Sequence, residues 1–109
     1  MKTGSLSILL ETSEYLVVDK PCDLCINGEK EGRAHGETVA SLLGRLRPEL
    51  VDNGVCSGFR FPHQLDYATS GALCITLNKK TTREAAALFK ERKVFKEYLA
   101  LVRQSWQFE

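Results

Sequence analysis

The sequence predicts an α+β fold, because two kinds of hydrophobic pattern occur along its 109 residues. Short apolar runs typical of strands lie at residues 7–11, 15–19 and 72–78, each bounded by polar or turn-forming residues. Apolar residues at helical spacing lie at residues 37–46 and 82–92. A chain of this length can form one small domain, or a piece of one.

The first two strand-like runs suit a hairpin, because only residues 12–14 separate them. Lys20 and Pro21 end the second run, since proline cannot continue a hydrogen-bonded strand. Residues 27–36 are rich in glycine and charged side chains, which predicts a polar loop.

The segment 37–46 predicts an amphipathic helix that packs on the sheet and ends before Pro48. Its apolar face repeats at i, i+3, i+4 and i+7, and consists of Val39, Leu42, Leu43 and Leu46.

The second helical segment follows the strand-like run at 72–78. The spacing of Thr81 and Glu84 is that of a capping box, which predicts a helix from Thr82 to about Arg92. Its expected buried stripe consists of Ala85, Leu88 and Phe89. Residues 94–102 then form a final extended run.

Composition favours an intracellular globular protein. No window approaches the roughly 18 apolar residues of a membrane span, and the N-terminal apolar run is too short for a secretory signal. We therefore expect the four cysteines to be free thiols. Cys22 and Cys25 form a C-x-x-C pair, but no second pair follows at zinc-finger spacing and no helix directly follows it. A thiol or zinc module remains an alternative to two structural cysteines.

The net charge of +1 conceals an asymmetry between the two halves of the chain. Residues 1–54 carry six Lys and Arg against nine Asp and Glu, whereas residues 55–109 carry nine against five. The basic residues expected to contact RNA phosphates are Lys79, Lys80, Arg83, Lys90, Arg92, Lys93 and Lys96. The alternative is a solvated helix face.

A polar loop at residues 63–71 precedes the strand-like run at 72–78. Three of its residues favour a tight turn, by bonding nearby backbone groups or by tolerating a positive φ: Thr69, Ser70 and Gly71. Asp66 lies at its centre and has two interpretations. It is either a turn residue whose carboxylate caps backbone N–H groups, or a positioned nucleophile.

The sequence His-Gln-Leu-Asp-Tyr-Ala-Thr-Ser-Gly at residues 63–71 resembles the His-Arg-Leu-Asp-x-x-Thr-Ser-Gly signature of RluA-type pseudouridine synthases. In that family the aspartate is the catalytic nucleophile, and Asp66 occupies its place. The other residues of this segment that are expected to support the catalytic loop are His63, Gln64, Leu65, Thr69, Ser70 and Gly71. Gln64 departs from the family, because most members have an arginine there that pairs with the aspartate. A neutral amide can orient Asp66 but cannot hold it by charge.

Two further segments resemble family motifs. Residues 15–24 resemble a hydrophobic strand closed by Lys-Pro-x-Gly, with Asp23 in place of the glycine, and the resemblance makes Lys20 and Pro21 scaffold residues that support the catalytic loop. Residues 94–102 resemble the Lys-x-Tyr-x-Ala motif, whose matching positions are Lys96, Tyr98 and Ala100.

The tyrosine of that second motif lies against the target uracil in the family and is a proposed acid or base in the later proton transfer. The resemblance assigns base stacking or proton transfer to Tyr98. The alternative is a core tyrosine in a sheet.

The resemblance implies an α+β domain with a mixed, largely antiparallel sheet flanked by helices, and an active site in a cleft across it. It covers residues 8–103, the N-terminal part of the family's catalytic domain, between an N-terminal extension at 1–7 and an atypical tail at 104–109. The expected reaction converts uridine to pseudouridine in single-stranded or loop RNA, with no cofactor, metal or membrane.

The family's third motif, which carries a basic and an apolar active-site residue, would follow the last residue of this sequence. We therefore expect the chain to be inactive alone. The alternative is a non-catalytic RNA-binding or regulatory fragment, and the oligomeric state stays open.

Overall fold

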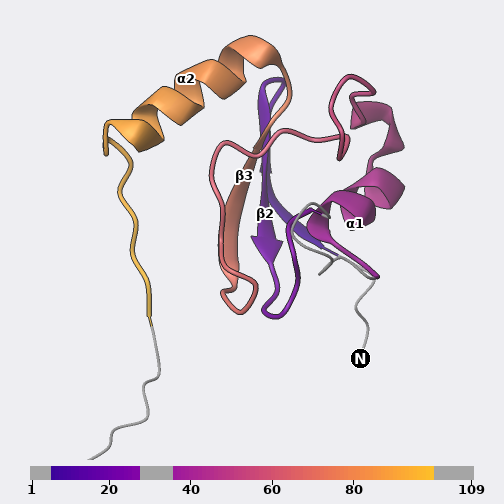
Figure 1. Ribbon diagram of the computed structural model, residues 1–109, viewed down its shortest axis with the longest axis horizontal. Coiled ribbons are helices and arrows are strands. Elements are labelled where there is room, and N and C mark those ends of the chain that lie inside the picture. The colour runs from indigo at the N-terminus through magenta and orange to yellow at the C-terminus, as the bar shows by residue number, and fades with distance from the viewer. Residues whose placement is uncertain (1–5, 28–35, 100–109) are drawn as a thin grey trace, which may run out of the picture.

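The computed structural model describes residues 6–27 and 36–99, which form a three-stranded antiparallel sheet with helices on opposite sides (Figure 1). The predicted α+β class is confirmed. In chain order the elements are β1 (Ser7–Glu11), β2 (Tyr15–Lys20), α1 (Val39–Leu46), the short 3₁₀ helix η1 (Pro48–Leu50), β3 (Gly71–Thr76) and α2 (Lys79–Lys90). None of the helices in this described part is long and apolar enough to cross a bilayer.

The predicted hairpin forms between β1 and β2, which pair antiparallel. Thr12 closes it, because its hydroxyl oxygen accepts hydrogen bonds from the backbone N–H groups of Glu14 (3.1 Å) and Tyr15 (3.0 Å). The register shifts between Ile8 and Leu10, so β1 carries a bulge.

Strand β3 pairs antiparallel with β2 over its full length, and this register decides which side chains enter the core. Leu16 lies opposite Ile75 and Val18 opposite Leu73, and all four side chains are fully buried. The opposite face of the same strands carries Val17 and Cys74, which are only partly buried. The main core therefore lies on one face of the sheet.

Helix α1 covers that buried face through Val39, Leu42 and Leu43. It starts with a capping box, in which the Thr38 hydroxyl accepts the N–H of Ser41 (3.1 Å) and the Ser41 hydroxyl accepts the N–H of Thr38 (2.9 Å). The helix predicted on the sheet is thus present. The prediction that Leu46 belongs to its buried face was wrong, because Leu46 is the last residue of the helix and is 43% exposed.

Helix α2 begins earlier than the Thr81–Glu84 spacing predicted. Asn78 is the N-cap, and its side-chain oxygen accepts the N–H of Thr81 at 2.8 Å. Because Asn78 already caps the first turn, Glu84 makes no capping bond and instead lies 3.9 Å from Lys80. The prediction of a capping box at Thr81 was wrong.

The C-terminal end of α2 also differs, since the helix ends at Lys90 rather than near Arg92. The N–H of Arg92 bonds the carbonyl of Phe89 (3.1 Å), and the N–H of Lys93 bonds the carbonyl of Leu88 (2.9 Å). These bonds form a Schellman ending, and Arg92 takes the left-handed conformation that it requires, with φ of 59°.

The predicted buried stripe of α2 was wrong at Leu88, which is 46% exposed. Ala85 and Phe89 are half-buried, and only Thr81 of this helix is fully buried. The cause is that the helix extends away from the sheet, as Figure 1 shows. Beyond it, residues 93–99 continue without helix or strand.

Candidate active site

The loop that carries Asp66 is anchored to β2 through one backbone carbonyl, that of Tyr67. It accepts hydrogen bonds from the Lys20 ammonium (3.1 Å) and from the N–H of Leu24 (3.1 Å). Lys20 is fully buried, and its second hydrogen bond goes to the carbonyl of Pro21 at 2.9 Å. Burial lowers the pKa of Lys20, and nearby Cys22, Cys25, Asp23 and Asp66 partly oppose that shift. Lys20 thus holds the turn that follows Asp66.

A backbone hydrogen bond closes the same turn from within the loop. The N–H of Thr69 bonds the carbonyl of Asp66 at 3.0 Å, and Gly71 has a φ of +137°, as predicted. The Thr69 and Ser70 side chains were expected to bond nearby backbone groups, but within the described residues they make no hydrogen bond. The turn depends on backbone bonds, because these hydroxyls line the adjacent cleft instead.

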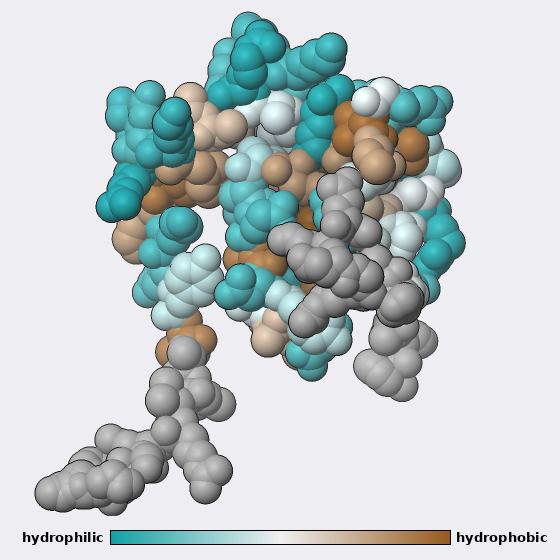
Figure 2. Space-filling view, in the orientation of Figure 1, coloured by the Kyte–Doolittle hydropathy of each residue, from teal (hydrophilic) through white to brown (hydrophobic). Residues whose placement is uncertain are grey.

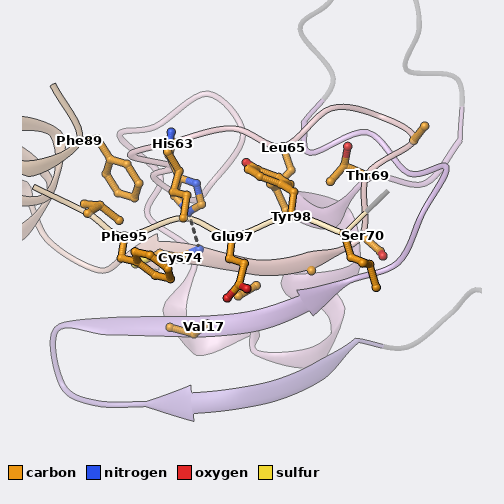
Figure 3. A pocket seen from close by; sticks show the side chains of 16 residues that line it. Val17, His63, Leu65, Thr69, Ser70, Cys74, Phe89, Phe95, Glu97 and Tyr98 are labelled. Carbon is orange, nitrogen blue, oxygen red and sulfur yellow. Dashed lines mark hydrogen bonds between the residues drawn. The ribbon is translucent and has the colours of Figure 1, made fainter. Parts of the chain in front are cut away.

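His63 anchors the upstream end of the loop. Its Nε2 accepts the N–H of Cys74 in β3 at 2.9 Å, and its ring stacks on Phe89 of α2 with centroids 4.5 Å apart and planes 12° apart (Figure 3). Burial, and secondarily the charge of Lys96, lowers the pKa of His63.

Asp66 itself is exposed, and its carboxylate accepts no hydrogen bond from the residues described. This observation disagrees with the interpretation of Asp66 as a capping turn residue, which requires a carboxylate bond to a backbone N–H. Gln64 is also exposed and makes no hydrogen bond to Asp66 or to any other described residue. Residue 64 therefore does not orient the carboxylate in this structure.

A cleft of about 930 Å³ lies beside the loop, between the less buried face of the sheet and residues 94–99. The loop contributes Leu65 and Thr69, and β3 contributes Cys74, whose thiol pKa is raised by burial. The cleft is open because the segment 94–99 stands apart from the body of the molecule, as Figure 2 shows. Asp66 is not among the lining residues, although Leu65 and Ala68 on either side of it are.

Aromatic rings are concentrated in this cleft. Tyr98 lines it together with Leu65 and is 63% exposed, so it is not a core tyrosine in this structure (Figure 3). Phe89 and Phe95 line the same cleft, and neither was a predicted site residue. Sequence reasoning missed both for different reasons. The helical spacing of Phe89 predicts a core residue, and Phe95 precedes a family motif without belonging to it.

The predicted phosphate-binding residues lie mainly on α2 and just after it. All seven are exposed, and Figure 2 shows hydrophilic side chains at the free end of this helix. Two of them have acidic neighbours, since Lys80 lies 3.9 Å from Glu84 and Lys93 lies 3.4 Å from Glu91. Lys96 is the one member of the set that lines the cleft.

The cysteines form no second site in the described residues. Cys22 is exposed, Cys25 is partly buried, and neither is disulfide-bonded. No group of three or more His, Cys, Asp or Glu side chains gathers there to hold a metal ion. The geometry consequently gives no support to the zinc alternative within that part of the chain.

A carboxylate on an anchored loop, beside a cleft lined with aromatic rings, defines a candidate site for chemistry on a planar base. A family model for RNA pseudouridylate synthase matches residues 14–108 of the chain. The chain therefore belongs to the RNA pseudouridylate synthase family, which confirms the resemblance seen in its motifs.

Individual relatives agree with this assignment. The chain is 50% identical, over 109 residues, to the RNA pseudouridylate synthase domain-containing protein 1 of Mus musculus, covering 94% of this chain and 34% of that protein. It is 34% identical over 100 residues to the ribosomal large subunit pseudouridine synthase C of Escherichia coli, covering 92% and 28%.

Among solved structures, the fold is similar to that of Human RNA Pseudouridylate Synthase Domain Containing 1. The TM-score is 0.64 at 37% identity, covering 84% of this chain and 30% of that chain. The chain thus spans about a third of the length of the relatives it matches.

Proposed function

We propose that the chain is part of an RNA pseudouridine synthase that isomerises uridine to pseudouridine, with Asp66 as the nucleophile. The observation that carries this proposal is the exposed carboxylate of Asp66, which accepts no hydrogen bond from the described residues and lies on a loop that is held at both ends. A nucleophile needs a free carboxylate and a fixed position, and this arrangement supplies both.

The reaction breaks the bond between N1 of uracil and C1′ of ribose, rotates the base, and joins C5 to C1′. The proton lost from C5 is balanced by one gained at N1, so neither a redox step nor an energy source is needed. Asp66 attacks either C1′ of the ribose or C6 of the base, and the structure is compatible with both.

The remaining site residues fit a flipped base. A uridine must leave its stack to reach Asp66, which favours single-stranded or loop RNA. Tyr98 offers an exposed ring in the cleft against which uracil stacks. The exposed cations of α2 then contact phosphates on the flanking nucleotides.

The test uses a chimera in which this chain is joined to the remaining C-terminal sequence of the mouse relative. Asp66→Asn in that chimera should abolish pseudouridine formation on uridine-rich RNA while leaving the melting temperature unchanged, because the carboxylate makes no bond in the described fold. Asp19→Asn is the matched control, since Asp19 is exposed on β2 and does not line the cleft. Near wild-type turnover by Asp66→Asn would leave Asp66 as a turn residue only.

A non-catalytic RNA-binding fragment is the second candidate, and Gln64 favours it. Its neutral amide makes no hydrogen bond to Asp66, so the carboxylate lacks the charged partner expected in the family. The same chimera distinguishes the two candidates. RNA binding without turnover, unchanged by Asp66→Asn, would support the fragment.

A further inference from the structure

His63 occupies the junction of three elements. It is three residues upstream of Asp66 in the loop, and its ring stacks on Phe89 of α2 (Figure 3). Its Nε2 accepts the Cys74 N–H on the edge of β3 that faces away from β2, where the carbonyl of Arg60 also accepts the N–H of Thr76. Cys74 in β3 pairs with β2 on its other side, so this N–H would otherwise be an open edge donor. A single imidazole thus binds the strand edge at Cys74, holds the loop and contacts the helix.

This contact fixes the chemical form of the ring. An Nε2 atom that accepts a hydrogen bond carries no proton, so His63 is the neutral tautomer with its proton on Nδ1. Protonation would place an N–H of the ring against the N–H of Cys74, and two donors cannot share a hydrogen bond. The acceptor role therefore exists only while the imidazole is neutral.

The surroundings of His63 favour the neutral form. The other titratable groups that line its cleft are Cys74 from β3 and three residues of the segment after α2, which are Lys96, Glu97 and Tyr98. Helix α2 adds only Phe89 to the lining, and β2 only Val17. Among these, Lys96 is the charge that acts on His63, and it opposes a second positive charge.

We propose that His63 is a positioning residue, whose neutral imidazole locks the Asp66 loop to β3 and α2 and releases it on protonation. As a role in catalysis, this rests on the proposed function. The physical lock itself does not, since it concerns hydrogen bonds and stacking within this chain.

The sign of the pH dependence follows from the lowered pKa of His63. The folded state binds the proton less well than the unfolded chain, so the contribution of His63 to stability is fully present above the ordinary pKa of 6.5. It declines as the pH falls below that value, and is lost once the pH passes below the folded pKa. The loop should therefore loosen in mild acid.

Amide hydrogen exchange on the 109-residue chain tests the lock without any assay of activity. Two amides report on it, namely Cys74, which bonds His63, and Thr69, which closes the turn at Asp66. Their protection factors, corrected for intrinsic exchange rates, should fall in the wild type as the pH is lowered from 7.5 through the ordinary histidine pKa of 6.5.

Two variants separate the parts of the mechanism. His63→Gln can place an amide oxygen near the position of Nε2 but does not titrate, so its protection factors should not change with pH. His63→Phe keeps a ring for Phe89 but offers no acceptor, so protection of both amides should be low at every pH. Thr69 protection in His63→Phe equal to that of the wild type would overturn the proposal.

In the chimera, the same variants connect the lock to turnover. His63→Phe should lower kcat at least tenfold with KM nearly unchanged, and His63→Gln should remove the acid limb of the wild-type pH profile. Normal kcat in His63→Phe would overturn the positioning role. If the chimera itself were inactive, the proposed function would fail, while the exchange result would still decide whether the lock exists.

Discussion

The loop around Asp66 is held by backbone groups, whereas the Asp66 carboxylate accepts no hydrogen bond from the described residues. The carbonyl of Asp66 accepts a hydrogen bond from the N–H of Thr69, and the carbonyl of Tyr67 accepts hydrogen bonds from the Lys20 ammonium and the N–H of Leu24. The loop is thus fixed through backbone groups and the buried ammonium of Lys20. Asp66→Asn should therefore leave the loop in place, so that any loss of turnover in this variant tests the proposed nucleophile rather than the fold.

The two proposed roles of Tyr98 can be separated by two substitutions. Stacking needs the ring, whereas proton transfer needs the hydroxyl, so Tyr98→Phe should bind RNA nearly as well as the wild type and Tyr98→Ala should bind less tightly. The expected loss for the alanine variant is about 1–3 kcal/mol, the range of base–aromatic stacking. Filter or fluorescence binding to a uridine-rich oligonucleotide measures it.

Leu88→Ala serves as the control for this comparison, because Leu88 is an exposed apolar residue of α2 that does not line the cleft. It should leave RNA binding unchanged. Equal losses in the phenylalanine and alanine variants of Tyr98 would exclude the stacking role.

At the residue scale, the sequence identified side chains but not their partners. The motif around Asp66 singled out the loop, and Lys20 was expected to support it. Of the two carbonyls that Lys20 binds, the one in the loop is 47 residues away, and no side-chain pattern can indicate a backbone partner. The same holds for His63, whose partner is the backbone N–H of Cys74.

At the element scale, the predictions succeeded where hydrophobic periodicity was strong. Strands β1 and β2 were placed within one residue, and α1 lies inside its predicted range. The predicted start of helix α2 was about three residues too late, because both Asn78 and Thr81 are possible N-caps. Asn78 prevails because its backbone is extended and its side chain reaches the N–H of Thr81.

The Schellman ending of α2 makes a prediction at this scale. Arg92 adopts a left-handed conformation, which destabilises the folded state by about 1 kcal/mol for a residue with a Cβ atom. Arg92→Gly should therefore stabilise the C-terminal turn of α2, raising the exchange protection of the Lys93 amide severalfold. Arg83→Gly is the matched control and should weaken the helix by about 1 kcal/mol, because Arg83 lies in the helix interior. Reduced protection in Arg92→Gly would contradict this account.

At the scale of the whole molecule, the sheet is well covered on one face and poorly covered on the other. Helix α1 seals the core face, and Arg47 after it forms a two-point ion pair with Glu11 at the end of β1. On the other face, the segment 94–99 leaves Phe95 85% exposed and Leu99 99% exposed. The sequence could not show this, since apolar residues such as these normally predict a buried strand.

The last prediction concerns the 109-residue chain by itself, which should give no measurable turnover on RNA. The described cleft is open along the segment 94–99, and the chain spans about a third of the length of its relatives. Covalent catalysis requires the base, the ribose and Asp66 in register, so a cleft with an open side loses positioning, and the rate should fall further than the affinity for RNA. Exposed Phe95 and Leu99 should also cause self-association, visible by sedimentation at micromolar concentrations.

The measurement of turnover compares pseudouridine formation by this chain and by the chimera at equal concentration, with the Asp66→Asn chimera as the blank. Comparable turnover by chain and chimera would show that residues 1–109 already build a complete active site.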